Sequence, residues 1–229
     1  MSKPNILFVL TSHNKLGKLD TPTGWYLSEL AHPYHVLHPK ANITVASPLG
    51  GEAPVDPASV EATTDDISVD FLNNRSEVWK TTQPLHTFLG KSDSFDALFY
   101  VGGHGFMFDL ADSEDSRKLI QEFWENDKVV AAICHAPAAF YNVRLSDGTL
   151  MVEGKDVTAF TNAEEEQVWL SKVVPFSAED VLQKASGGRF VKAGELFGEK
   201  VVVSGKLITA QNPASGIGVG EAIARALGV

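Results

Sequence analysis

The single cysteine of the chain stands where a nucleophile could act. Residues 129–133 have the pattern of a buried strand, residues 134–137 (CHAP) that of a sharp turn, and residues 138–140 that of a helix start. The side chain at such a junction leaves the sheet, and backbone N–H groups point toward it. We therefore predict that Cys134 is a nucleophile whose thiol pKa lies about one unit or more below its ordinary value of about 8.5. A small buried apolar residue is the alternative, and this pattern alone does not separate the two.

A second apolar segment also ends in a loop suited to chemistry. Residues 98–101 (LFYV) are followed by Gly102, Gly103, His104 and Gly105. Glycines let a backbone approach a ligand closely and direct N–H groups at a developing negative charge. We expect Gly102, Gly103 and His104 to form an oxyanion or substrate site, although a glycine-rich turn without a ligand has the same pattern. Both loops would lie at the carboxyl edge of a parallel sheet, where open α/β folds bind ligands.

Acidic residues supply candidates for proton transfer. Glu29 lies in the apolar helical stretch WYLSEL, where loss of hydration would raise its pKa and suit it to general acid–base catalysis. A solvated glutamate on the outer face of a helix is the alternative. Glu164, Glu165 and Glu166 are typical of a solvated first helical turn, but one of them could orient His135, and the residues do not indicate which.

Other motifs do not support a cofactor or metal. Residues 90–92 (GKS) lack the earlier glycine of a phosphate-binding loop, and the glycines at 216, 218 and 220 do not have dinucleotide-binding spacing. His32, His35 and His38 recur every third residue, but prolines interrupt the segment and no nearby acid completes a ligand set. We therefore expect no metal and no cofactor.

Composition excludes some classes of partner. The chain has 229 residues and a net charge of -10, which argues against nucleic acids and anionic membranes as partners. The apolar run at residues 6–10 is too short to span a membrane and lacks a signal-cleavage pattern. With one cysteine, no intramolecular disulfide can form. We expect a cytoplasmic protein that is small enough to enter the nucleus as well.

Strand-like and helix-like segments alternate along the chain. The pattern predicts strands at residues 6–10, 43–46, 97–101 and 129–133, and helices from about Thr23, near residues 75–80 and 84–89, and at 113–126 and 214–227. Such alternation favours a parallel sheet covered by helices on both faces. Turn signals at residues 146–148 and 204–205 predict two hairpins, at 143–151 and 201–210, added at a sheet edge. We expect one domain over residues 1–229.

Five segments together resemble the ThiJ/PfpI superfamily. They are residues 23–29 (TGWYLSE), 102–105 (GGHG) with Asp109 and Leu110 after it, 132–137 (AICHAP), 160–165 (FTNAEE) and 211–215 (QNPAS). The branch that the chain resembles most is that of the fungal heat-shock chaperones that act as glutathione-independent glyoxalases. The resemblance extends from residue 6 to residue 227.

This resemblance implies a flavodoxin-like three-layer sandwich that is usually a homodimer. It implies Cys134 as nucleophile, Glu29 as its proton partner and His135 as the third member of the site, with a later acid completing a Cys-His-acid arrangement. We assign that last role to Glu166, with Glu165 as the next choice.

The activity implied is the conversion of methylglyoxal, a small 2-oxoaldehyde, to lactate without a cofactor, in stress response and aldehyde detoxification. The alternatives are a stress-inducible holdase that binds unfolded clients, and a protein deglycase or cysteine peptidase that uses the same thiol.

Overall fold

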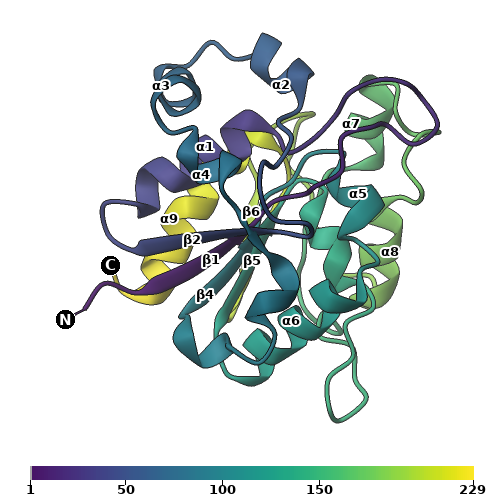
Figure 1. Ribbon diagram of the computed structural model, residues 1–229. Coiled ribbons are helices and arrows are strands. Elements are labelled where there is room, and N and C mark those ends of the chain that lie inside the picture. Colours follow the sequence, from purple (N-terminus) through teal and green to yellow (C-terminus); the bar gives the residue numbers. More distant parts are fainter. Residues whose placement is uncertain (1) are drawn as a thin grey trace.

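The structure is a computed structural model and describes residues 2–229. Seven strands form one sheet: β1 (Asn5–Val9), β2 (Asn42–Ser47), β3 (Gln83–Pro84), β4 (Ala97–Tyr100), β5 (Val129–Ile133), β6 (Val201–Ser204) and β7 (Leu207–Ala210). Their order across the sheet is β3-β2-β1-β4-β5-β7-β6 (Figure 1). Every neighbouring pair is parallel except β6 and β7.

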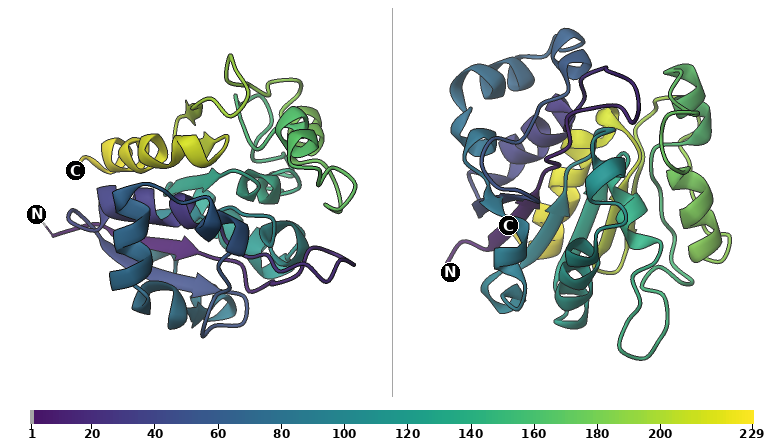
Figure 2. Two further views of the ribbon diagram at one scale, coloured as in Figure 1. Left: turned by 90° about the horizontal axis from the view of Figure 1, so that it is seen from above. Right: turned by 45° about the vertical axis from the view of Figure 1, so that its right-hand side comes forward.

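The helices lie on both faces of this sheet (Figures 1 and 2). They are α1 (Leu27–Leu37), α2 (Pro57–Glu61), α3 (Asp66–Asn74), α4 (Glu77–Lys80), α5 (Phe106–Asp109), α6 (Glu114–Glu125), α7 (Asn162–Gln167), α8 (Ala178–Ala185) and α9 (Gly216–Leu227). Four 3-10 turns, η1 to η4, occupy Leu85–Phe88, Ser92–Ser94, Ala136–Phe140 and Pro213–Ser215. The predicted α/β fold, a flavodoxin-like sandwich with a mostly parallel sheet between helices, is confirmed.

The sheet separates two apolar cores because successive side chains of a strand point to opposite faces. In β1, Ile6 and Phe8 join the core beneath α1 and α9, whereas Leu7 and Val9 join the core that includes residues of α6 and α8. All four side chains are fully buried. The near-continuous apolar runs that marked β1, β4 and β5 in the sequence are therefore strands covered on both sides.

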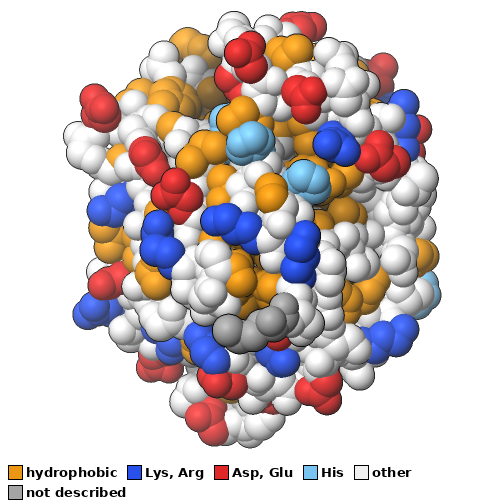
Figure 3. Space-filling view, turned by 90° about the vertical axis from the view of Figure 1, so that its left-hand side faces the viewer, with side chains coloured by type: hydrophobic (Ala, Val, Ile, Leu, Met, Phe, Trp, Pro, Cys, Tyr) orange, Lys and Arg blue, Asp and Glu red, His pale blue; other side chains and the backbone are white. Residues whose placement is uncertain are grey.

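The surface is more mixed than the interior. The face shown in Figure 3 carries acidic and basic side chains together with apolar ones. His35 and His38 line a small hollow between α1 and α3, together with Tyr34 and Phe71. Neither histidine contributes to the site described below.

Only one of the two predicted hairpins belongs to the sheet. Strands β6 and β7 form an antiparallel pair at its edge, as expected from the turn at residues 204–205. Residues 143–151 also turn back on themselves, with an antiparallel bridge between Arg144 and Leu150, but they lie outside the sheet, so the predicted place at a sheet edge is wrong. The preceding strand β5 is already paired on both sides, with β4 and β7, and offers no free edge for another strand.

Parallel strands bring four distant loops to one edge of the sheet. The segments that follow β1, β4, β5 and β7 begin near residues 10, 101, 134 and 211, respectively. These are the carboxyl ends of the strands, the edge at which open α/β sheets bind ligands. Cys134 and the glycine loop therefore meet at the edge where the sequence predicted them.

Candidate active site

Cys134 directly follows β5 and has a left-handed backbone, with φ of 63°. Its N–H donates to the carbonyl of Ala210 at 2.8 Å, and its carbonyl accepts from the N–H of Phe160 at 2.8 Å. A non-glycine residue in a strained conformation costs about 1–3 kcal/mol and persists only where its surroundings hold it. The two hydrogen bonds come from segments far away in the sequence and fix the thiol at the sheet edge.

The segment after Cys134 is not the helix that the sequence indicated. Residues Ala136–Phe140 form a five-residue 3-10 turn. Short 3-10 segments have few aligned peptide dipoles, so the electrostatic support for a thiolate is weaker here than at the start of a long α-helix.

His135 and Glu165 lie on one side of the thiol. The Nδ1 atom of His135 is 3.2 Å from the sulfur of Cys134, and its Nε2 atom is 2.6 Å from Oε2 of Glu165. The assignment of Glu166 to this role is wrong, because Glu166 is exposed while Glu165 is buried against the imidazole. Successive residues of a helix point about 100° apart, so only one of the two can face His135.

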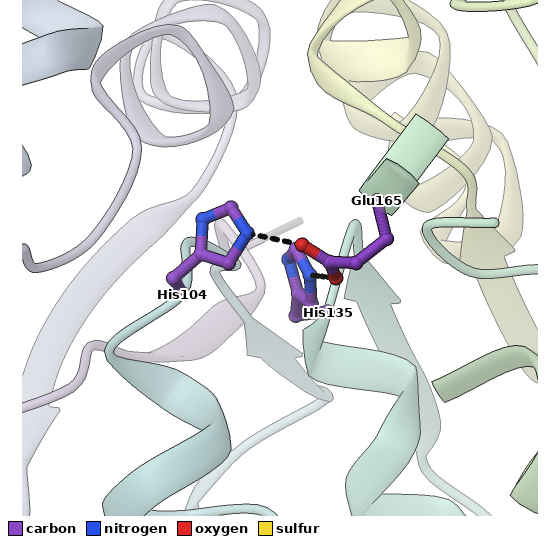
Figure 4. Close-up of side chains that lie close together, drawn as sticks. All are labelled: His104, His135 and Glu165. Carbon is purple, nitrogen blue, oxygen red and sulfur yellow. Dashed lines mark hydrogen bonds and ion pairs between the residues drawn. The ribbon is translucent and has the colours of Figure 1, made fainter. Parts of the chain in front are cut away.

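A second imidazole binds the same carboxylate. The Nε2 atom of His104 lies 2.7 Å from Oε1 of Glu165, and Figure 4 shows both rings pointing at this carboxylate from the loops after β4 and β5. Burial would raise the pKa of Glu165, but His135 and the hydrogen bonds from the two imidazoles outweigh it, and the pKa lies well below its ordinary value.

The protonation of His135 follows from these contacts. An ionised carboxylate only accepts hydrogen bonds, so both Nε2 atoms donate to Glu165. Burial lowers the pKa of His135, and His104 lowers it further, so the ring is neutral at neutral pH. A neutral ring that carries its proton on Nε2 presents an unprotonated Nδ1 to the thiol of Cys134. This is the geometry of a nucleophile beside an oriented base.

Glu29 also lies next to the thiol and has no comparable partners. Its side chain is completely buried, and no hydrogen bond of normal geometry from a described residue reaches either carboxylate oxygen. Burial raises the pKa of Glu29 to about 8, although the neighbouring thiol of Cys134 acts in the opposite direction. A carboxyl group with this pKa can both accept and return a proton near neutral pH.

The pKa of the Cys134 thiol shifts in the direction opposite to the one predicted from the sequence. Burial, followed by the carboxylate of Glu29, raises the pKa of Cys134 well above its ordinary value. The N–H of Gly103 acts the other way but does not outweigh them. Cys134 is therefore a thiol in the resting protein, and a nearby base must remove its proton when it reacts.

Comparison with known proteins agrees with this fold. The sequence pattern of the DJ-1/PfpI family matches residues 27–226. The chain belongs to the DJ-1/PfpI family. No helix within residues 2–229 has both the length and the apolar character needed to cross a membrane.

Relatives within this DJ-1/PfpI family include several fungal glyoxalases. The chain is 27% identical to the glutathione-independent glyoxalase HSP31 of Saccharomyces cerevisiae over 94% of each protein. It is 36% identical to the probable glutathione-independent glyoxalase hsp3103 of Schizosaccharomyces pombe, over 59% of this chain and only 54% of that protein.

Solved structures show the same architecture. The Rapid Encystment Protein 24 kDa of Francisella tularensis superposes with a TM-score of 0.91 at 37% identity, over 98% of this chain and 99% of the other. Glyoxalase III of Candida albicans superposes with a TM-score of 0.87 at 25% identity, over 97% of both chains.

In this DJ-1/PfpI protein the thiol opens into a small cavity. The cavity has a volume of about 250 Å³, and Cys134, His135, Gly103 and His104 line it. Apolar side chains that include Phe160 and Phe197 form much of the remaining wall. Such a lining, with a few convergent polar groups, suits a small organic substrate.

Gly102 acts as a spacer and does not line this cavity, in contrast to the prediction. A Cβ atom at this position would lie 2.6 Å from both the Cβ of Cys134 and Oε2 of Glu29. Glycine at 102 therefore allows the thiol and the buried carboxyl group to approach each other. Gly103 does line the cavity, with a φ of 112° that other residues rarely adopt.

Glu164, one of the three acids considered as a partner of His135, has a structural role that was not expected. Its Oε1 atom accepts hydrogen bonds from the N–H of Phe197 and from the side chains of Gln211 and Asn212. It also completes a capping box with Thr161 at the start of α7. The spacing of Thr161 and Glu164 is the sequence signal that could have identified it.

His32, His35 and His38, the histidines considered as zinc ligands from the sequence, do not belong to the group of potential metal ligands in the structure. His32 is hydrogen-bonded to Asp65 at 3.0 Å. Over residues 2–229, the one group of three potential metal ligands in close proximity is His104, His135 and Glu165. No spacing along the sequence marks this group, because its members come from three separate segments.

Proposed function

We propose that this protein is a glutathione-independent glyoxalase that converts a small 2-oxoaldehyde, with methylglyoxal as the simplest example, to the corresponding 2-hydroxy acid, lactate. The observation that carries the proposal is the placement of one thiol next to two different proton-transfer groups. His135 lies 3.2 Å from the sulfur of Cys134, and the buried carboxyl of Glu29 is also next to Cys134. Relatives named as glyoxalases that align over nearly the whole chain support the same activity.

The first step is addition of sulfur to the aldehyde. The thiol proton of Cys134 passes to Nδ1 of His135 or to an ionised Glu29, and the sulfur forms a bond with the aldehyde carbon. The carbonyl oxygen becomes an alkoxide and takes up a proton to give a hemithioacetal. The N–H of Gly103, which already faces the sulfur, is placed to stabilise the developing charge.

The second step moves hydrogen between the two former carbonyl carbons. A base removes the proton from the hemithioacetal carbon, and the electrons pass through an enediol to the adjacent ketone. Return of a proton to the second carbon gives a thioester of a 2-hydroxy acid. A group with a pKa of about 8 suits both halves of this transfer, and Glu29 has that value.

The third step releases the product. Water attacks the thioester, the carbon–sulfur bond breaks, and the sulfur regains a proton. One carbon has been oxidised and its neighbour reduced, so the sum of the reaction is methylglyoxal plus water giving lactate. The oxidation and reduction balance within the substrate, and the residues described supply all the proton transfers.

The test is lactate formation from methylglyoxal in the absence of glutathione. The wild-type protein should form lactate at a rate proportional to protein concentration, and Cys134→Ala should form none. Glu166→Gln serves as a matched control, because Glu166 is an exposed residue of α7, the helix that carries Glu165, and does not contact His135. A folded wild-type protein that forms no lactate would disprove the proposed activity.

A holdase role is the second candidate, and a specific surface favours it. Trp169 is 87% exposed and Leu196 is 47% exposed, and both line an open hollow beside α7. Large exposed apolar side chains that gather in one place are typical of protein-binding surfaces. The two functions separate through one variant: Cys134→Ala should lose lactate formation but keep suppression of client aggregation, whereas Trp169→Ser should show the reverse.

A further inference from the structure

Two imidazoles that line the cavity share one buried carboxylate. Each imidazole presents its Nε2 atom to a different oxygen of Glu165, at 2.7 Å from His104 and 2.6 Å from His135. The potential ligand atoms of the three residues all lie within 4.8 Å of one another. The sheet and α7 fix these residues, which come from the loop after β4, the turn after β5 and the helix itself.

We infer that His104, His135 and Glu165 form a binding site for a divalent transition-metal ion such as Zn²⁺, and that its occupation prevents activation of Cys134. Zinc binds imidazole nitrogen and carboxylate oxygen at about 2.0–2.2 Å with tetrahedral geometry. Such geometry needs ligand atoms about 3.3–3.5 Å apart, which small side-chain rotations of this group would reach. Two histidines and one carboxylate leave a fourth position open.

Access and rigidity both favour this site. His104 and His135 line the cavity, so an ion in the cavity lies next to two of the three ligands, and Glu165 is hydrogen-bonded to both of them. The ring of Phe160 packs 4.6 Å from that of His135, which limits the movement of this ligand. Imidazole ligands select zinc and its transition-metal neighbours over magnesium or calcium, which prefer oxygen ligands.

Metal binding changes which nitrogen of His135 carries the proton. A metal–nitrogen bond at Nε2 requires that atom to lose its proton, and a neutral ring then holds its proton on Nδ1. Nδ1 is the atom that lies 3.2 Å from the sulfur of Cys134. In the metal-bound form, His135 therefore donates to the sulfur and cannot accept the thiol proton. The ion would therefore prevent His135 from acting as a base without binding the sulfur of Cys134.

The direct test measures metal binding and does not depend on enzymatic activity. Titration calorimetry with Zn²⁺ should show one site in the wild-type protein. The variants His104→Ala and Glu165→Gln should each bind at least about 10-fold more weakly, since even loss of an outer contact to a metal ligand costs 10–100-fold. Cys134→Ala and His86→Ala should bind as the wild type does, because the thiol is not a ligand and His86 is exposed elsewhere.

Cobalt(II) distinguishes the ligand set by its spectrum. The wild-type protein should show visible absorption bands of a four-coordinate nitrogen and oxygen site, without an intense sulfur-to-cobalt band in the near ultraviolet. Such a sulfur band, loss of binding in Cys134→Ala, or unchanged binding in a correctly folded His104→Ala would overturn the assignment. Absence of any zinc binding to the wild-type protein would also overturn it.

The inhibition rests on the proposed glyoxalase activity and is tested separately from binding. One equivalent of bound Zn²⁺ should suppress lactate formation, and a chelator should restore it. Full turnover in protein shown by calorimetry to be zinc-loaded would disprove the switch. A protein without any glyoxalase activity would disprove the proposed function and leave the binding result standing.

Discussion

Glu29 and Glu165 are both buried glutamates of the same candidate active site, yet their pKa values shift in opposite directions. Burial raises the pKa of Glu29 to about 8, and no described N–H or O–H group offsets this. Burial acts on Glu165 in the same sense, but His135 and His104 outweigh it and leave the pKa well below its ordinary value. The difference lies in the donors that the fold supplies to each carboxylate.

This contrast separates two roles that residue type alone does not separate. A carboxyl group that changes protonation near neutral pH can move protons, as required of Glu29 in the proposed reaction. A carboxylate that stays ionised can instead fix the orientation and tautomer of an imidazole, as Glu165 does for His135. Glu29 and Glu165 therefore have different chemical roles in the candidate active site.

Replacement of Glu29 should have the largest effect on turnover among the acidic residues. Glu29→Gln keeps the shape of the side chain but removes its exchangeable proton. General acid–base groups contribute about 10²–10⁴-fold, so we expect a decrease in kcat of about 10²-fold or more. Steady-state lactate production from methylglyoxal measures this. Near-wild-type turnover in Glu29→Gln, with an inactive Cys134→Ala protein, would show that His135 alone moves the proton.

Replacement of Glu165 should cost less activity and change the pH profile. Glu165→Gln removes the negative charge that keeps the Nε2 protons of both imidazoles in place, but leaves His135 next to the sulfur. We expect a decrease in kcat of about 10-fold, below the contribution of a direct proton-transfer group. The measurement is kcat against pH for both variants. A larger loss in Glu165→Gln than in Glu29→Gln would reverse the assignment of roles.

The stability of the protein should respond to pH with opposite signs at the two carboxyls. The folded pKa of Glu29 lies above the ordinary value of 4.5, so the folded state holds more protons than the unfolded state between pH 4.5 and about 8. The contribution of Glu29 to the free energy of unfolding therefore decreases as the pH rises from 4.5 to about 8. Glu165 has a lowered pKa, so the stability that it contributes is present above its unfolded pKa and is lost at lower pH.

Denaturant unfolding of the wild type and the two Gln variants at several pH values tests this pair of signs. From pH 5 to pH 8, the wild type should lose stability relative to Glu29→Gln. Below pH 4.5, it should lose stability relative to Glu165→Gln. Parallel stability curves for the wild type and Glu29→Gln would show that Glu29 titrates normally in the folded protein.

Replacement of Glu166 should have the smallest effect. This residue is exposed, and the carboxylate that contacts His135 is that of Glu165. Substitutions at such surface positions change stability by about 0.5 kcal/mol or less. We expect Glu166→Gln to retain the kcat and the stability of the wild type. A loss as large as that of Glu165→Gln would indicate that α7 rotates in solution and brings Glu166 to the imidazole.

The sequence by itself was sufficient for the fold class and the position of the nucleophile. Apolar strands and their turn residues are local signals, so the strand before Cys134 and the glycines at 102 and 103 could be found without tertiary information. Parallel strands must then bring both loops to one edge of the sheet. The apolar stretch around Glu29 likewise carried the information that its carboxyl group is buried.

Tertiary structure alone decided which glutamate binds His135 and in which direction the thiol pKa moves. In α7, Glu164 binds the N–H of Phe197, Glu165 binds the imidazoles and Glu166 is exposed to solvent. Successive side chains of a helix point in different directions. Which direction faces the imidazoles depends on how the helix packs against the rest of the protein. The thiol pKa depends on the burial of Cys134 and on its approach to Glu29, a residue more than a hundred positions away. Distances between such residues arise only when the chain is folded, and pattern along the sequence does not encode them.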